Sequence, residues 1–178
     1  MKRLNAKQLR TTEPDPEKIK RLKKNPIYIV LDNVLDTYNV GAIFRLADAT
    51  GCEKIYLCGQ TETPPNPRIK KASINTWKWV TWSYASTAVE ALQELKVKSS
   101  KLKVIAIEQN NKSIKLKDFE PTFPICIVVG NETYGVSKEI LKIADRIVEL
   151  PMFGVNKSLN VMVTLGIVLY RIVEYFSR

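Results

Sequence analysis

The chain has 178 residues, which fits one domain, and 45% of them are hydrophobic, enough to bury a sizeable core. Its net charge of +10 favours a polyanionic partner, either nucleic acid or a membrane surface, although a protein can be basic without one. Histidine is absent. This excludes Ser-His-Asp and Cys-His nucleophiles, H-E-x-x-H zinc sites and imidazole general bases.

The positive charge is concentrated at the start of the chain. Residues 1–24 hold nine Lys and Arg against three acids, so they carry +6 of the net +10. We predict a basic arm or a loosely packed helix here, ahead of one folded domain at 25–178. The arm has no apolar stretch like that of a signal peptide, and a cytoplasmic protein is expected.

Neither a membrane span nor a metal site is expected. The longest uncharged apolar stretch, residues 158–170, has 13 residues, whereas a transmembrane helix needs about 20. The three cysteines, Cys52, Cys58 and Cys126, form no C-x-x-C pair, and two of them lie in or beside apolar runs. Buried free thiols are therefore predicted, rather than reactive or metal-bound ones.

The first part of the chain alternates strand and helix patterns. Short β-branched runs predict strands, spaced apolar residues predict helices, and three prolines predict a loop. The expected elements are a strand at 27–31, a helix at 39–49, a strand at 54–58, a loop at 61–67, a helix at 84–95 and a strand at 102–107. Between them Trp77, Trp79 and Trp82 alternate with other residues. A half-buried strand is predicted there, with stacking on RNA bases as the alternative.

The second part continues the alternation. The pattern predicts an all-apolar strand at 124–129, a helix at 137–144, a strand at 146–150 and an apolar helix at 158–176. We therefore expect an α/β fold, a mostly parallel sheet with helices on both faces. The last helix is apolar on more than one face. It is either shared with a second copy of the chain or central to a monomer.

Three polar clusters follow or end these apolar runs, where open α/β sheets place their sites. They are N-V-G-A-I-F-R at 39–45, V-V-G-N-E-T-Y-G at 128–135 and L-P-M-F-G-V-N-K-S-L-N-V at 150–161. Gly130 and Gly135 have P-loop spacing, but Val136 and Ser137 follow where Lys and Ser/Thr are required. No G-x-G-x-x-G is present either. ATP hydrolysis and ordinary dinucleotide binding are thus unsupported.

Together the clusters resemble the three motifs of the SpoU-type (TrmH-like) RNA 2′-O-ribose methyltransferases of the SPOUT superfamily. The matching residues are Asn39-x-Gly41-x-x-x-Arg45, Gly130-Asn131-Glu132 and Ser158-Leu159-Asn160-Val161, and the likeness covers about residues 27–175. It implies S-adenosylmethionine as methyl donor, a C-terminal trefoil knot, and a homodimer with the active site at the subunit interface.

The resemblance also implies an RNA substrate. The chain lacks the large N-terminal RNA-binding domain of several rRNA-directed relatives, so tRNA is favoured over rRNA, with a D-loop guanosine as the family's best-known target. The alternatives are an rRNA 2′-O-methyltransferase and a non-catalytic RNA-binding protein on the same fold. The intact motif residues argue against the second.

Residue roles follow from the same resemblance. Arg45 acts on the target ribose hydroxyl and its phosphate, and Asn39 helps to order that site. Glu132, Ser158 and Asn160 complete the catalytic set. The donor is held largely by backbone groups of three loops. The implied donor-binding residues are Ile107, Glu108, Gly130, Asn131, Leu150, Met152 and Leu159.

Elementary chemistry refines the role of Arg45. A guanidinium stays protonated, so we expect it to stabilise developing oxyanion charge and to clamp a phosphate rather than to accept a proton. The proton acceptor is left open. Met162 departs from the family, which often has Ser or Ala there, so local packing should differ.

Each of these side chains also has a purely structural alternative. Asn39 could be a helix N-cap, Arg45 could pair with Asp48, Glu132 could be a loop acid, and Ser158 could cap the last helix.

Overall fold

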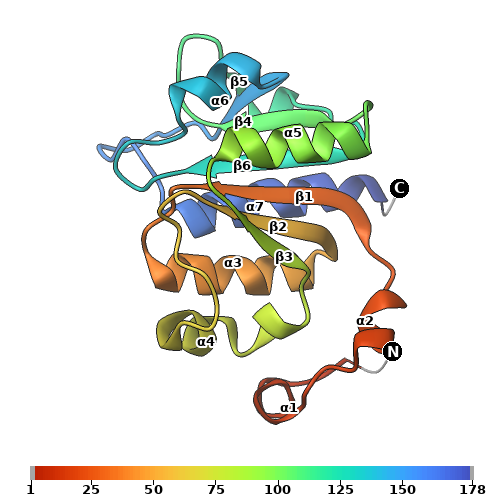
Figure 1. The fold of residues 1–178 in the computed structure, drawn as a ribbon. Helices are drawn as coiled ribbons and strands as arrows, with labels where there is room; N and C mark the ends of the chain where they lie inside the picture. Colours follow the sequence, from red (N-terminus) through yellow and green to blue (C-terminus); the bar gives the residue numbers. More distant parts are fainter. Residues whose placement is uncertain (1–2, 177–178) are drawn as a thin grey trace.

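The computed structural model describes residues 3–176, with only the backbone described for Lys18, and its centre is a seven-stranded sheet. Every strand pair is parallel, and the order is β3-β2-β1-β6-β4-β7-β5 (Figure 1). The strands are β1 (Asn25–Asp32), β2 (Cys52–Cys58), β3 (Trp82–Ala85), β4 (Lys103–Ile107), β5 (Ile114–Lys115), β6 (Ile125–Gly130) and β7 (Arg146–Glu149). The expected parallel α/β sheet is confirmed.

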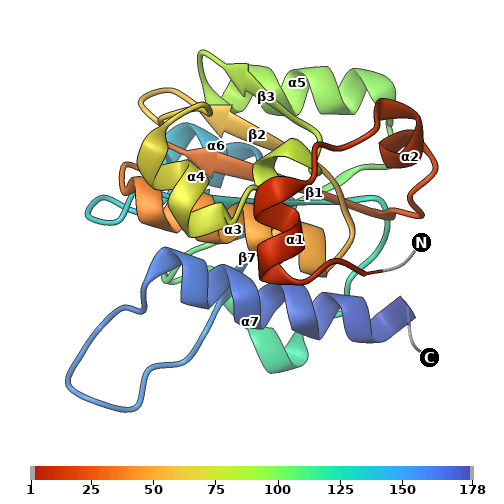
Figure 2. The same cartoon turned by 90° about the horizontal axis from the view of Figure 1, so that it is seen from below.

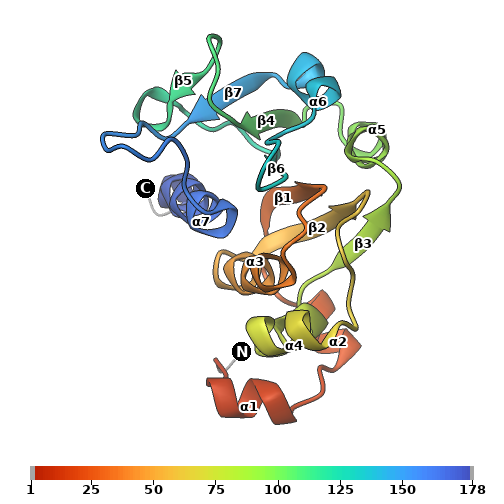
Figure 3. The same ribbon diagram turned by 90° about the vertical axis from the view of Figure 1, so that its left-hand side faces the viewer.

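Helices cover both faces of the sheet (Figure 3). One layer contains α3 (Thr37–Ala49), α4 (Pro67–Ser73) and α7 (Val161–Val173), and the other contains α5 (Ala88–Lys98) and α6 (Lys138–Ile143). Short 3₁₀ turns are η1 (Thr76–Lys78), η2 (Leu116–Asp118) and η3 (Glu174–Phe176). Two short helices, α1 (Ala6–Thr11) and α2 (Pro16–Lys20), precede β1.

Alternating side chains divide the core into two halves. On β1, Ile27, Ile29 and Leu31 pack on the α3 and α7 side, whereas Val30 packs on the α5 and α6 side. Successive residues of a strand point to opposite faces. A strand that is buried on both faces therefore reads as one continuous apolar run, and this is why the sequence reveals the central strands so clearly.

Most predicted ends shift by one to three residues, and three segments need a larger correction. Residues 77–82 are not a half-buried strand: Trp77 and Trp79 lie in or beside η1, and β3 begins only at Trp82. Helix α5 begins at Ala88 rather than at residue 84, because the N-cap is Thr87, whose side chain accepts from Glu90 N. The sequence reading missed α4, since its charged stretch carries little apolar periodicity. None of the three tryptophans is exposed, and Trp82 packs edge-to-face on Phe44.

Helix α7 buries only one of its apolar faces. Leu165, Val168, Leu169 and Ile172 are fully buried against the core. Along another face Val163, Ile167 and Tyr170 are 41%, 43% and 53% exposed. Helix α7 packs closely on α3, since a Cβ at Gly166 would stand 3.4 Å from Leu46 Cδ2. The final helix is thus not enclosed by its own chain.

Within residues 3–176, no helix is long and apolar enough to cross a membrane. The same residues contain no cluster of His, Cys, Asp and Glu suited to a metal ion. Cys52, Cys58 and Cys126 are free and buried, as predicted. Burial raises the pKa of the Cys52 and Cys58 thiols to about 12, so both stay protonated at neutral pH.

Candidate active site

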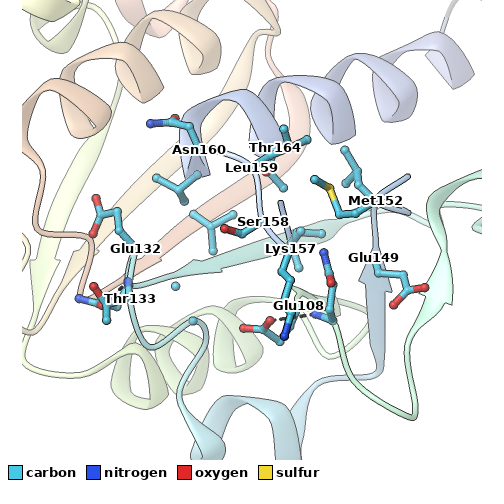
Figure 4. Close-up of a pocket in the computed structure, with 18 of the residues that line it drawn as sticks. Glu108, Glu132, Thr133, Glu149, Met152, Lys157, Ser158, Leu159, Asn160 and Thr164 are labelled. Atoms are coloured by element: carbon cyan, nitrogen blue, oxygen red, sulfur yellow. Dashed lines mark hydrogen bonds between the residues drawn. The ribbon is translucent and has the colours of Figure 1, made fainter. Parts of the chain in front are cut away.

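The carboxyl ends of β4, β6 and β7 surround a cavity of about 580 Å³, with the segment 150–160 closing one side (Figure 4). Open parallel sheets commonly place ligands at this edge. All seven residues expected to bind the donor line the cavity, together with Glu132, Ser158 and Asn160. Figure 4 shows Glu132 and Asn160 on one side of the cavity, and Glu149 and Met152 on the other.

The wall after β6 is a tight turn that requires glycine. Asn131 N donates to Gly135 O at 3.0 Å, and Gly135 N donates to Asn131 O at 2.9 Å. A Cβ at Gly130 would stand 2.2 Å from the Gly135 carbonyl, and Gly135 itself has a φ of +70°. Glycine adopts this conformation and allows this close approach without steric cost. The turn therefore depends on both glycines.

Two side chains fix this turn to neighbouring strands. The Glu108 carboxylate accepts from Val136 N at 2.9 Å and from Gln109 N at 2.8 Å. Asn131 accepts from the backbone N–H groups of residues 133 and 134, and its amide donates to Asn33 O at 2.9 Å. Glu108 and Asn131 thus shape the cavity wall as well as line it.

A chain of hydrogen bonds joins the three sequence clusters. Asn160 Nδ2 donates to Asn39 Oδ1 at 3.0 Å, and Asn39 Nδ2 donates to Glu132 Oε1 at 3.0 Å. Glu132 also accepts from Leu35 N at 3.0 Å and from Asp36 N at 3.1 Å. Residues separated by about a hundred positions therefore meet at one side of the cavity. We call Asn39, Glu132 and Asn160 the amide–carboxylate chain.

This arrangement rules out two of the structural alternatives. The N-cap of α3 is Asp36, and Asn39 lies inside the helix, where it is 6% exposed. The N-cap of α7 is Asn160 and not Ser158, because Asn160 Oδ1 accepts from Met162 N at 2.9 Å. Glu132 does lie in the loop after β6, where three donors anchor its carboxylate.

The hydrogen bonds also set the charge state of Glu132. Desolvation raises the pKa of this carboxyl, but the hydrogen bonds from Asn39 and from nearby backbone N–H groups outweigh it, so the pKa lies below its ordinary value. Glu132 is therefore ionised at neutral pH. A carboxyl with a lowered pKa stabilises the fold above its unfolded-state pKa, and this contribution disappears as the pH falls through the folded-state pKa.

Glu132→Gln is expected to lower the free energy of unfolding at pH 7 by about 1 kcal/mol, since the neutral amide makes weaker hydrogen bonds and solvent screens this partly exposed site. The difference from wild type should shrink as the pH falls below about 4.3, where the unfolded carboxyl protonates. Urea unfolding of both proteins at pH 7 and pH 3.5 measures it. A difference that is the same at both pH values would contradict the assigned charge state.

Arg45 lies outside the donor cavity. It is exposed on α3, and its side chain forms no hydrogen bond or ion pair with any described residue of 3–176, so the alternative pairing with Asp48 is not found. It lines a second cavity of about 450 Å³, beside Ala6 and Leu9 of α1 and Met162 of α7. A single copy of the protein therefore brings together Asn39, Glu132, Ser158 and Asn160. Arg45 of the same copy lies apart from them.

The sequence reading missed two residues at the end of β1, its last residue and the one that follows it. Asp32 is 3% exposed and accepts from Ser137 N at 2.9 Å. Asn33 has a φ of 58°, and its carbonyl accepts from Asn131. Both lie at the end of a buried strand, the position that revealed the cluster after β6. The same logic applied to β1 would have found them.

The fold is an open parallel α/β sheet. A cavity of small-molecule size and the amide–carboxylate chain lie together at its carboxyl edge, as in α/β enzymes that bind a small ligand. The model of the SpoU rRNA Methylase family matches residues 26–170, and the chain belongs to this family. The resemblance noted in the sequence is thereby confirmed.

Among curated relatives, tRNA (guanosine(18)-2′-O)-methyltransferase of Aquifex aeolicus is 33% identical over 166 residues, covering 86% of this chain and 74% of that protein. The Thermus thermophilus protein of the same name is 29% identical, covering 86% of this chain and 77% of that protein. The chain spans 60% of the Escherichia coli protein of that name.

Solved structures share the fold. The A. aeolicus TrmH/SpoU tRNA modifying enzyme has a TM-score of 0.79 at 30% identity, covering 97% of this chain and 82% of that one. The methyltransferase AviRb from Streptomyces viridochromogenes, solved with AdoMet, has a TM-score of 0.79 at 22% identity, covering 92% of this chain and 65% of that one.

Proposed function

We propose that this protein transfers a methyl group from S-adenosylmethionine to a ribose 2′-hydroxyl of RNA, with a tRNA D-loop guanosine as the favoured target. The observation that supports this proposal most strongly is the amide–carboxylate chain, which joins all three family motifs at the edge of the 580 Å³ cavity. The tRNA assignment is supported by relatives named as tRNA (guanosine(18)-2′-O)-methyltransferases.

The cavity suits the proposed donor. Its volume lies within the range of about 300–1,000 Å³ that is usual for small-ligand pockets. Ile107, Leu150 and Leu159 offer apolar surface for an adenine ring, while Glu108 and Glu149 offer carboxylate acceptors for hydroxyl and ammonium groups. Gly130 lets the turn after β6 close tightly on Gly135, and this turn forms part of the wall that the donor would meet. When bound, S-adenosylmethionine supplies a methyl group on a sulfonium.

The residues of the amide–carboxylate chain, with Ser158 and Arg45, would position the nucleophile, which is the ribose 2′-hydroxyl. Asn39, held between Glu132 and Asn160, fixes the start of α3 relative to the cavity. The Ser158 hydroxyl in the wall can bond to the ribose, and Arg45 stabilises charge on the reacting oxygen while holding the neighbouring phosphate. Positioning of this kind is the main contribution to an in-line transfer.

We further propose a homodimer that completes the active site. Arg45 lies outside its own chain's donor cavity, beside Met162 at the start of α7. The exposed apolar face of α7, formed by Val163, Ile167 and Tyr170, begins one residue further on. A second copy covering this face would lie next to Arg45. A C-terminal trefoil knot and a cytoplasmic location are part of the same proposal, as is a boundary near residue 24 between the arm and the domain.

Ile167→Asp is expected to separate the dimer into monomers at micromolar concentration, because it places a charge in the centre of an apolar interface. Val97→Asp is the matched control: Val97 is 88% exposed on α5, in the opposite helix layer. Sedimentation velocity reports the oligomeric state. A wild-type monomer, or an Ile167→Asp dimer as tight as wild type, would contradict the proposed interface.

Methyl incorporation from labelled donor tests the substrate class. Unmodified tRNA transcripts are expected to accept label, and rRNA fragments to accept little. Efficient labelling of rRNA but not of tRNA would show that rRNA is the substrate. Donor binding with no labelling of either RNA would favour a non-catalytic RNA-binding protein on this fold.

A further inference from the structure

The basic N-terminal segment is docked on the folded domain. Helix α1 lies below α3 and α4 in Figure 1, and it therefore stands in front of α3 in Figure 2, which is seen from below. Its Ala6 and Leu9 form part of the wall of the second cavity, whose lining also includes Arg45 and Met162. The segment therefore reaches the surroundings of Arg45 in the free protein, before any RNA is bound.

A strained connection between α4 and η1 contacts the end of α1. Ile74 and Asn75 both adopt left-handed backbone conformations, with φ values of 53° and 66°. For a β-branched residue such as Ile74 this conformation is a genuine outlier, and it persists only where the surrounding structure enforces it. Such strain is concentrated at functional sites. This connection therefore merits a functional explanation.

Asn75 joins the connection to the arm. Its side chain is buried, with the residue 5% exposed, and Nδ2 donates to Arg10 O at 3.1 Å and to Leu9 O at 3.5 Å. Carbonyls in the last turn of a helix have no partner within that helix. Asn75 therefore caps α1 from outside. A second contact comes from the same region, the ion pair of Lys78 with Glu13.

The docked helix carries unpaired positive charge. Lys7 and Arg10 are exposed on α1, and neither forms an ion pair within residues 3–176. Arg45 across the second cavity is also without a carboxylate partner in that range. Arg45 lines this hollow, as does Asp48, and Lys7 and Arg10 directly follow its lining residues Ala6 and Leu9 on α1. Phosphate contacts of this kind fix the register of a bound nucleic acid.

We infer that Asn75 is a positioning residue for RNA, which holds α1 beside the hollow that Arg45 lines, so that Lys7 and Arg10 of this helix contact the phosphodiester backbone of the substrate together with Arg45. The inference rests on the proposed function. A docked arm binds more tightly than a tethered one, because less conformational entropy is lost when the RNA binds. The Asn75 contact should therefore affect RNA capture and leave donor binding unchanged.

Asn75→Gly tests this with little backbone strain, since glycine accepts a positive φ and only the amide side chain is removed. Hydrogen exchange of residues 3–13 is expected to accelerate at least about tenfold, and the KM for tRNA to rise roughly tenfold. The kcat at saturating tRNA and the donor Kd should stay within about twofold of wild type. Glu13→Gln, which breaks the second contact, should shift exchange and KM in the same direction by less.

Thr87→Ala is the control, because it removes the N-cap of α5 without touching the arm. It should destabilise the protein without changing exchange at residues 3–13 or the KM. Unchanged arm exchange in Asn75→Gly would overturn the inference. Faster arm exchange in Asn75→Gly with an unchanged KM for tRNA would also overturn it. A lower kcat in this variant without a higher KM would do the same. If the wild-type protein transfers no methyl group, the proposed function is wrong. The hydrogen-exchange measurement does not require methyl transfer, so the two failures are distinguishable.

Discussion

Arg45→Ala is expected to lower turnover roughly a hundredfold or more at saturating RNA, because it removes a fixed positive charge from the position where oxyanion charge develops. Donor affinity should be unchanged, since Arg45 does not line the donor cavity. Single-turnover kinetics measure the first quantity and calorimetry measures the second. Arg146→Ala is the control, an exposed arginine at the start of β7, which is the end of the strand opposite the cavity.

Mixed dimers then decide which chain supplies Arg45. If Arg45 completes the partner's site, mixing Arg45→Ala subunits with donor-deficient Gly130→Ala subunits should restore activity. Random pairing would give about a quarter of the wild-type rate, because half of the dimers are mixed and each has one intact site. No recovery would place Arg45 in its own chain's site. Wild-type turnover in Arg45→Ala alone would refute the catalytic role.

Gly130→Ala is expected to reduce donor affinity about 10- to 100-fold. The new Cβ would stand 2.2 Å from backbone atoms of Gly135, so the turn that forms the cavity wall must shift. Overpacking of this kind costs about 1–3 kcal/mol, and a loss of about 1.4–2.8 kcal/mol in binding free energy gives the expected 10- to 100-fold effect. Calorimetry with the donor and with its demethylated product measures the effect.

Gly154→Ala is a matched control in the segment 150–160, since a Cβ there meets no atom within 4 Å. It should bind the donor like wild type. If Gly130→Ala binds as tightly as Gly154→Ala, the turn after β6 is not part of the donor site.

The sequence predicted the central sheet well because those strands are buried on both faces. Strands such as β6 are wholly apolar, and no helix pattern competes with them. It predicted α4 and the residue 77–82 region poorly, because capping and tertiary contacts decide these segments. Asn66 caps α4 by accepting from Arg68 N and Ile69 N, and a cap of this kind leaves only a weak trace in a charged sequence.

The residues of the donor cavity were predictable for a different reason. They follow buried strands, and parallel strands bring their carboxyl ends to one edge of the sheet. The hydrogen bonds between Asn39, Glu132 and Asn160 were not predictable, since they join residues 93 and 121 positions apart. The contact of α1 with Asn75 could not be predicted from the sequence either. It depends on a left-handed backbone that Ile74 does not favour.

Mass spectrometry of nucleosides tests the central claim most directly. Unmodified tRNA is incubated with the protein and isotopically labelled S-adenosylmethionine, and then digested to nucleosides. We predict a labelled 2′-O-methylated nucleoside, with guanosine as the base, that is absent when Arg45→Ala replaces the wild-type protein. Label on a base in place of the ribose, or no labelled nucleoside from protein that binds the donor, would contradict the claim.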